Sequence, residues 1–436
     1  MAIAMFQSIT FKVLGIGVLA LLMLIPLAQV QGLIGERNRM RDQAVSSIAQ
    51  RWGAVQDFGG PVLAIPKRVR VDTSNGWIVH ESTEIVLADK LQIAGVMAPE
   101  ERHYGMYSAP VYLAELKVSG RFVAGDLRAL AAPETTYLWE RAELRLPLAD
   151  VRGIRRISAL RLDGVDHAFA PADGVVGTLS AIAVPLDLSH FDGDAHAFSF
   201  DLTLAGTATL HLLPLARVSE AVLSASWRDP SFDGAFLPAE RKIGQGGFEA
   251  HWQVLDLNRS FGQHWQQDSN SRVDITSAAF GVGLYQPAGI YQQNDRAGKY
   301  GILFIALTFI AFFLFEILRN LRVHPVQYLL VGLALTTFYL VLLALSEQIA
   351  FGLAYLAAAS AVVLLVAGYA AAVLRARRAG LLLGITLALV YALLYGLVIS
   401  EQYSLLIGAL ALLCVVGALM YLTRRVDWYA YASATG

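Results

Sequence analysis

Three glutamates interrupt the hydrophobic C-terminal third of this 436-residue sequence: Glu316, Glu347 and Glu401. A carboxylate in or beside a membrane span can carry ions or protons, so each is a candidate for a functional or structural role. We expect Glu347 and Glu401 at one membrane–water interface, where a charge costs little, and favour solvated turn acids over an ion-handling role. Glu316 is expected nearer the opposite interface, where snorkelling and a helical pair with Arg319 account for it.

Two of these acids end similar segments. Residues 345–348 read Leu-Ser-Glu-Gln and residues 399–402 read Ile-Ser-Glu-Gln, each after an apolar stretch that contains aromatic residues. The similarity indicates a helical hairpin duplicated in the same orientation, as in some transporters. A second interpretation stays open, in which both carboxylates accept bonds from the base of the preceding domain, such as Arg296 or Lys299.

The rest of the sequence contains no recognisable catalytic motif. It has no G-x-S-x-G, H-E-x-x-H, Walker A or C-x-x-C pattern, and its single cysteine, Cys414, lies in an apolar run. Eight of the nine histidines lie between residues 80 and 264, none at metal-ligand spacing with an acid or cysteine, and we expect solvated strand residues. The glycine-rich stretch 243–248 is interpreted as a turn between strands. We therefore predict no enzyme, no cofactor and no metal site.

Composition indicates a membrane protein. Hydrophobic residues make up 56% of the chain and charged residues 16%, against about 45–50% and about 25% in soluble domains. Residues 301–436 contain seven arginines, no lysine and four acids. This distribution indicates a membrane-embedded C-terminal third and excludes a purely cytosolic protein. The net charge of −1 gives no support for a nucleic-acid partner, and membrane lipids are the expected surroundings.

Six apolar segments are long enough to cross a bilayer as helices. They cover residues 11–30, 301–318, 326–345, 349–372, 381–399 and 402–422. We interpret the first as a retained anchor, because it exceeds the usual core of a cleaved signal peptide and no clear cleavage site follows. Ala44, Ile48 and Trp52 recur every four residues after it, which predicts that the helix continues as an amphipathic stalk.

The arginines set the expected orientation. They follow the second, fourth and sixth spans, whereas the short loops 346–348 and 400–402 contain no lysine or arginine. The positive-inside rule therefore places both termini in the cytoplasm and residues 31–299 in the periplasm. Arg37, Arg39 and Arg41 lie against the rule, just outside the first span.

The segment between the first two spans alternates apolar and polar residues. One apolar face comprises Phe198, Phe200, Leu202, Leu204, Ala208, Leu210 and Leu212, and residues 114–119 and 141–146 alternate in the same way. Turn signals separate such stretches: Ser74-Asn75-Gly76, Asp163-Gly164, Asp173-Gly174, Asp192-Gly193 and Asp233-Gly234. These patterns predict half-buried antiparallel strands in a sandwich or in two stacked β units.

The predicted fold class is a multi-pass α-helical membrane protein with a large β-rich periplasmic domain. It has six transmembrane helices, one N-terminal and five C-terminal. Residues 1–32 are expected to form the anchor, 33–299 the periplasmic domain, 300–424 the five-helix domain and 425–436 a cytoplasmic tail.

Several segments resemble the CreD family of bacterial inner-membrane proteins. They are residues 60–63, 231–238, 247–252, 296–316, 324–332 and 338–348. His324 opens one of them and is the fourth candidate residue; Gln348 stands where many members have histidine. The resemblance implies an inner-membrane protein linked to cell-envelope integrity and to a two-component stress regulon. It implies no catalytic residue, ligand or transport substrate.

These observations support three functions to different degrees. The favoured one is a non-enzymatic protein of envelope integrity, whose β domain contacts an unidentified envelope or periplasmic partner. The alternative is a transporter or lipid-handling protein that uses the five-helix domain, for which Thr336, Thr337, Ser360 and Thr386 offer only a thin polar pathway. An envelope enzyme has no nucleophile–base arrangement to support it.

Overall fold

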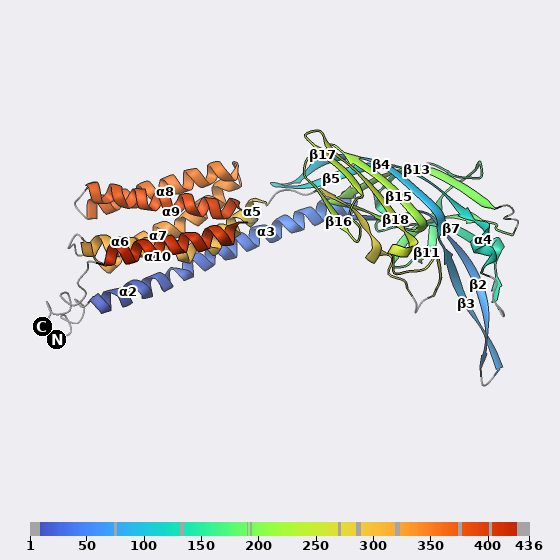
Figure 1. Ribbon diagram of the computed structural model, residues 1–436, viewed down its shortest axis with the longest axis horizontal. Helices are drawn as coiled ribbons and strands as arrows, with labels where there is room; N and C mark the ends of the chain where they lie inside the picture. Colours follow the sequence, from blue (N-terminus) through green and yellow to red (C-terminus); the bar gives the residue numbers. More distant parts are fainter. Residues whose placement is uncertain are drawn as a thin grey trace. The chain divides into compact units, whose positions relative to one another are not determined.

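The computed structural model divides the chain into two compact units (Figure 1). It describes residues 9–73, 76–130, 135–189, 191, 194–268, 272–284, 289–318, 323–373, 377–400 and 403–424. The helical unit comprises Met1–Met40 and Ala288–Gly436, and the β unit comprises Arg41–Pro287. The predicted limits of the β domain, residues 33 and 299, lie outside those of the β unit, because the chain is helical over much of 33–40 and 288–299.

The β unit consists of two sheets. Sheet A runs β16 (Pro230–Gly234), β20 (Phe280–Leu284), β14 (Thr209–Leu213), β1 (Gln56–Gly59), β7 (Ala142–Leu148), β2 (Val62–Thr73), β3 (Gly76–Val86) and β19 (His264–Gln267), with β12 (Leu179–Leu186) and β11 (Ala170–Val176) beside β7 and β6 (Thr135–Tyr137) beside β2. Sheet B runs β10 (Val165–His167), β9 (Leu160–Leu162), β13 (Ala195–Thr207), β5 (Tyr107–Val123), β4 (Ala88–Tyr104), β15 (Ala216–Ala225), β18 (Gly247–Leu255) and β17 (Glu240–Gly244), with β8 (Ile154–Ile157) beside β13.

The two sheets enclose one hydrophobic core. Leu144 of sheet A and Leu202 and Trp252 of sheet B all belong to it, each at most 2% exposed. Among the described strands the pairings are antiparallel except β1 with β14 and β4 with β15. This arrangement confirms the β-rich domain that the alternating residues predict, because each strand presents every second side chain to the core.

The predicted apolar face from Phe198 to Leu212 is divided between two strands. Phe198 to Leu204 lie on β13 of sheet B, whereas Leu210 and Leu212 lie on β14 of sheet A. The chain changes sheet at Ala208, whose φ of +63° breaks the extended conformation. The period of two continues across the break because both strands bury alternate residues in the same core.

The turn signals were correct in part. Asp163 and Gly164 join β9 to β10 with φ of +49° and +85°, and the glycine-rich stretch joins β17 to β18 as predicted. Gly174, by contrast, lies inside β11, where the register with β12 shifts between Pro171 and Val175. It is an irregularity within a strand, so that turn prediction was wrong. Asn75 and the pair at 192–193 lie outside the described residues.

The N-terminal helix continues into the β unit, as the stalk prediction requires. α2 (Ile9–Leu22) and α3 (Leu24–Trp52) together form one long N-terminal helix with a local irregularity at Met23. Pro26 has no N–H to bond the carbonyl of Leu22, which accounts for the irregular turn. Ile48 packs with Ala109 and Val111 in a small cluster.

Trp52, the last residue of α3, lies in a socket formed by Tyr112, Arg102 and Arg155. Its indole Nε1 donates to the carbonyl oxygen of Tyr112 at 3.3 Å. The Arg102 and Arg155 guanidinium groups lie 4.3 Å and 4.9 Å from the ring centroid, at cation–π distance. The last turn of α3 is therefore fixed to the β unit by both packing and polar contacts.

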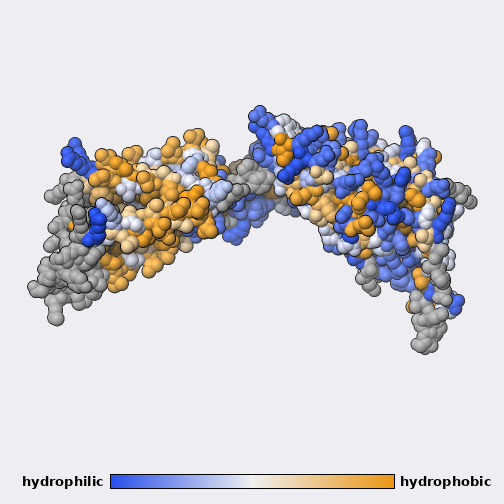
Figure 2. Space-filling model, in the orientation of Figure 1, coloured by the Kyte–Doolittle hydropathy of each residue, from blue (hydrophilic) through white to orange (hydrophobic). Residues whose placement is uncertain are grey.

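The C-terminal part of the helical unit begins with the short polar helix α5 (Ile290–Lys299). The apolar helices that follow are α6 (Gly301–Leu318), α7 (Pro325–Ser346), α8 (Phe351–Val373), α9 (Arg377–Ile399) and α10 (Ser404–Thr423). In the described residues, five helices including the N-terminal one are long and apolar enough to cross a membrane, or six if α5 and α6, bent by 45°, form one span. Figure 2 shows the apolar residues that cover this unit.

Candidate functional site

Glu316 is a buried ion-pair partner near the end of α6. Its side chain is 4% exposed. One carboxylate oxygen accepts from the Lys12 ammonium and from the backbone N–H of Val323, the latter at 2.7 Å. The other accepts from the Tyr328 hydroxyl at 3.0 Å. Three donors and one compensating charge make this a fully bonded carboxylate, which is the condition for burying it at tolerable cost.

The sequence-based account of Glu316 was therefore wrong. A snorkelling carboxylate would be exposed, and this one is enclosed by α2, α6 and α7. Arg319, the helical partner that the spacing suggested, lies outside the described residues. The real partner, Lys12, is 304 positions away in the sequence, so helical spacing could not indicate it.

His324 begins the helix that brings Tyr328 to Glu316. Its ring Nδ1 accepts from the backbone N–H of Val326 at 3.3 Å, and the backbone N–H of His324 donates to Gln327 Oε1 at 3.0 Å. Pro325 follows at the first helical position, where a missing N–H costs nothing. His324 is thus the N-cap of α7, so the role that the structure shows for this candidate residue is to begin a helix.

Glu347 caps the opposite end of α7. Its side chain is 11% exposed, and it accepts from the Tyr291 hydroxyl of α5 at 3.1 Å. Arg37 Nε of α3 lies 3.6 Å from the same oxygen. Beside them, Asn294 donates to the Ser346 hydroxyl at 2.8 Å. Three helices, α3, α5 and α7, therefore meet at this acid.

The prediction of a solvated Glu347 was wrong. The second interpretation was closer, but the partners are Arg37 and Tyr291, whereas Lys299 pairs with Asp295 at 2.7 Å. Arg37, which lay against the positive-inside rule, has a carboxylate partner that offsets its charge. Glu401 lies outside the described residues, so the structure does not describe the second acid of the repeat.

Two clusters, Glu316 with Lys12 and Glu347 with Arg37, bond the N-terminal helix to the other helices of the helical unit. Lys12 and Arg37 are 25 residues apart, which corresponds to about 37 Å of helix. A bilayer is about 30 Å thick in its hydrocarbon core and about 40–45 Å with its headgroups. The distance between the two clusters along the helix is therefore close to the thickness of a bilayer.

A buried stripe joins these two clusters along the N-terminal helix. Met23, Leu27, Val30 and Ile34 are each at most 9% exposed. A Cβ at Gly332 of α7 would lie 2.7 Å from Met23 Sδ, and one at Gly301 of α6 would lie 2.8 Å from Leu27. Glycine at both positions lets the N-terminal helix approach the other helices closely.

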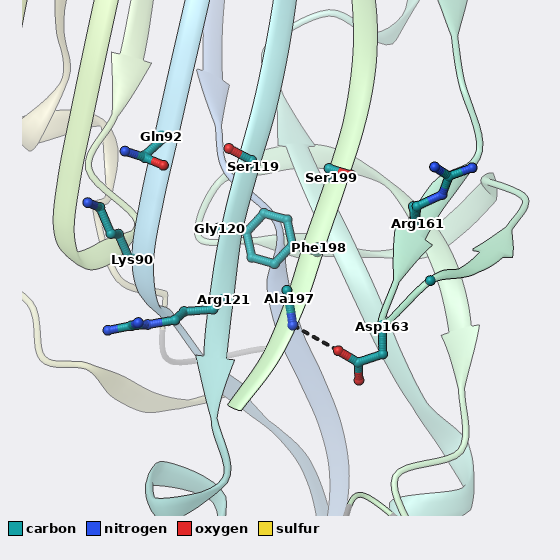
Figure 3. Close-up of a pocket in the computed structure, with 11 residues that line it drawn as sticks. Lys90, Gln92, Ser119, Gly120, Arg121, Arg161, Asp163, Ala197, Phe198 and Ser199 are labelled. Carbon is teal, nitrogen blue, oxygen red and sulfur yellow. Dashed lines mark hydrogen bonds between the residues drawn. The ribbon is translucent and has the colours of Figure 1, made fainter. Parts of the chain in front are cut away.

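A shallow depression of about 570 Å³ lies on the outer face of sheet B (Figure 3). Small residues such as Ser119 and Ser199 lie between longer side chains that include Lys90, Arg121 and Arg161. Each of these cations already pairs with an acid of its own chain: Lys90 with Glu220 at 3.2 Å, Arg121 with Asp89 at 2.8 Å and Arg161 with Asp166 at 3.0 Å. The depression is open, and its cations are already neutralised by acids of the same chain. A preformed ligand site is usually enclosed and offers polar groups that are free to bind.

Two histidines of the β unit are not solvated strand residues, contrary to prediction. The His196 side chain is 7% exposed, stacks on Phe191 at 3.3 Å and bonds Asp163 at 2.6 Å. His211 lies between Asp57 and Asp233. Within the described part of the chain, no group of three or more histidine, cysteine or acidic side chains is placed to hold a metal ion.

Comparisons with known proteins match nearly the whole chain. The family model described as "Inner membrane protein CreD" matches residues 8–429. The protein "Inner membrane protein CreD" of Escherichia coli (strain K12) is 33% identical over 422 residues, covering 94% of this chain and 92% of that protein.

Proposed function

Because this chain belongs to the CreD family of inner membrane proteins, we propose that it supports cell-envelope integrity and the response to envelope stress without catalysing a reaction. The β unit contacts an envelope or periplasmic component, and the helical unit anchors the protein and responds to that contact. The inner-membrane location follows from the family and from the apolar helices.

The observation that carries this proposal is the placement of α3. The helix contributes Arg37 to the ion pair with Glu347 in the helical unit, and Trp52 to the socket in the β unit. No loop separates the two attachment points, since α3 is continuous over Leu24–Trp52. A change in the β unit that moves Trp52 would therefore act on a helix whose Arg37 is paired with Glu347 at the end of α7.

The proposed orientation has both termini in the cytoplasm and residues 31–299 in the periplasm. Arg377 and Arg378 at the start of α9 and Arg424 at the end of α10 support it. Reporter fusions after Arg378 should show cytoplasmic activity, and fusions near His211 should show periplasmic activity. A periplasmic signal from the Arg378 fusion would contradict the orientation.

The role of α3 is tested by reversing its charge pair. In cells that lack the chromosomal gene, Arg37→Glu should reduce growth in dilute medium with detergent, and Arg37→Glu with Glu347→Arg should restore it. Arg39→Glu is the matched control, because Arg39 is exposed and its Nε donates to the Gly35 carbonyl of its own helix at 3.3 Å. Wild-type growth of Arg37→Glu at equal protein level would remove the support for coupling through α3.

The alternative, a transporter or lipid-handling protein, needs polar groups that are free to line a pathway. Thr336 and Thr337 instead donate to the carbonyls of Gly332 and Leu333 at 2.8 Å each, and Thr386 donates to Leu382 at 3.0 Å. These hydroxyls are satisfied within their own helices. The alternative is therefore less well supported than an anchoring and responding role.

A further inference from the structure

Asp57, His211, Gly281 and Asp233 form one row across four neighbouring strands of sheet A. Asp57 of β1 is paired with His211 of β14, His211 with Gly281 of β20, and Gly281 with Asp233 of β16. His211 Nδ1 lies 2.9 Å from Asp57 Oδ1, and Nε2 lies 3.2 Å from Asp233 Oδ1. The imidazole thus bridges two carboxylates that come from strands on either side of it.

Glycine at position 281 makes the bridge possible. Strands in a sheet are about 4.8 Å apart, so Asp233 lies about two strand spacings from His211. A Cβ at Gly281 would lie 2.1 Å from the Leu210 carbonyl oxygen and 2.8 Å from His211 Cα. The row therefore has no side chain between the histidine and the second aspartate.

The bridge is complete only when the imidazole is protonated. A neutral imidazole has one N–H, so it can donate to one carboxylate while its other nitrogen presents a lone pair to the second. An imidazolium donates to both and also carries the compensating positive charge. Losing the proton therefore removes one of the two bonds and leaves two carboxylates facing an uncharged ring.

The second carboxylate belongs to a segment that closes one side of the sandwich. Among the described strands, β16 lies at the edge of sheet A and pairs with β20 alone. The ring of Phe232 on β16 lies 5.7 Å from Phe248 and 5.8 Å from Trp252, both on β18 of sheet B. Trp252 Nε1 also donates to the Phe236 carbonyl at 3.2 Å. Residues 230–236 therefore link the two sheets at this edge.

In the described part of the chain, the charged groups that face His211 are Asp57 and Asp233. Neither β14 nor β20 carries another titratable side chain. On β5, the buried Tyr112 hydroxyl donates to the Thr209 carbonyl at 2.8 Å, and burial, aided by the charge of Asp57, raises the pKa of that phenol. Tyr112 stays neutral at any pH of interest here.

The sign of the pH dependence follows from these surroundings. The hydrogen bond to Asp57 raises the pKa of His211 above its ordinary 6.5, and the charge of Asp233 adds to this against the opposing effect of partial burial. A group whose pKa is raised on folding stabilises the fold below its ordinary pKa. That contribution is lost as the pH rises through the folded-state value.

We infer that His211 is a proton-operated clamp, which holds β16 and the turn after it on the sandwich when protonated and releases them when it loses the proton. The released segment would uncover the aromatic side chains of Phe248 and Trp252. This inference concerns the β unit itself and stands whether or not the proposed function is correct.

Hydrogen–deuterium exchange of the full-length protein in detergent micelles tests the clamp. Exchange is measured at pH 5.5 and pH 8.5, with each rate divided by that of an unstructured peptide at the same pH. We expect peptides over residues 230–238 to exchange roughly tenfold faster at pH 8.5, the range of a lost charge-assisted hydrogen bond. Peptides over residues 198–206 of β13 should not change.

His211→Gln should remove the pH dependence and give fast exchange at both pH values. His251→Gln is the matched control, since the His251 side chain is 43% exposed on β18 and its ring bonds Glu249 at 3.1 Å; it should behave as wild type. If His211→Gln does not fold, Asp233→Asn decides the question, and the pH effect must shrink. Constant exchange of 230–238 in the wild type, or an unchanged pH effect in Asp233→Asn, would overturn the clamp.

Discussion

The Lys12 ammonium donates to the Glu316 carboxylate and joins the first membrane-spanning helix to α6. The carboxylate is buried, whereas the lysine side chain is 30% exposed. Variants of this pair, of the Trp52 socket, of Gly332 and of Asp150 should each have a measurable effect on stability.

Removing Lys12 should destabilise the helical unit. Lys12→Met leaves the Glu316 carboxylate without its compensating charge, and breaking a buried pair costs about 3–5 kcal/mol. The double variant Lys12→Met with Glu316→Leu should recover much of that loss, because no charge remains buried. Thermal unfolding in detergent measures the difference. Lys299→Met, which removes an exposed pair with Asp295, is the control, and an equal effect in both single variants would argue against a special role for Lys12.

Trp52 should contribute to the stability of the β unit. Trp52→Ala removes the indole from its socket together with the bond to Tyr112 and two cation–π contacts, a loss of about 2–4 kcal/mol. Trp52→Phe should lie between, since it keeps most of the packing and loses the N–H donor. Trp77→Ala provides the comparison, because Trp77 is 59% exposed. Limited proteolysis of the β unit at rising temperature would rank the three variants.

A large side chain at position 332 should displace the N-terminal helix. Gly332→Leu would force branched carbons into the space of Met23 and Phe309, whose ring lies 2.9 Å from the Cβ position. Overpacking of this kind typically costs about 1–3 kcal/mol. At Gly368 of α8 nothing lies within 4 Å of the Cβ position, so Gly368→Leu should be tolerated. Equal melting temperatures for both variants would show that α7 and the N-terminal helix are not in close contact.

Asp150 should stabilise the β unit at neutral pH and not in acid. Its carboxylate bonds the Arg152 side chain at 2.9 Å and the backbone N–H groups of Arg152 and Ala54 at 3.0 Å and 3.2 Å. These bonds hold its pKa below the ordinary 3.8, so the stabilisation is present above that value and is lost as pH falls below it.

Asp150→Asn should therefore lower stability at pH 7 by about 1–3 kcal/mol. The difference from wild type should shrink below pH 3.8. Asp166→Asn, at an exposed pair with Arg161, should have little effect at either pH. A deficit of the same size at pH 7 and in strong acid would contradict the assignment.

Local patterns in the sequence predicted local structure well. The alternation from Phe198 to Leu204 identified a half-buried strand because side chains on a strand point to opposite faces. The four-residue spacing of Ala44, Ile48 and Trp52 identified the docked face of α3 in the same way. Both patterns depend only on residues close together in the chain.

Contacts between distant residues could not be predicted in this way. Glu316 had a plausible neighbour in Arg319, and nothing in the sequence pointed instead to Lys12. His211 had the spacing of a solvated strand residue, because its two partners come from β1 and β16. The change of sheet at Ala208 was hidden because β13 and β14 bury alternate residues in the same core. In each case the missing information was which strands or helices become neighbours.

The pairing of Lys12 with Glu316 also determines when, during synthesis of the chain, the first helix can be fixed in place. The lysine leaves the ribosome 304 residues before its partner, and at about 5–20 residues per second this corresponds to roughly 15–60 s. Throughout that interval the first helix occupies the membrane with an unpaired ammonium near one end. That end must stay at the aqueous surface until α6 has entered the membrane, so the helix made first is locked in place only after most of the chain has been made.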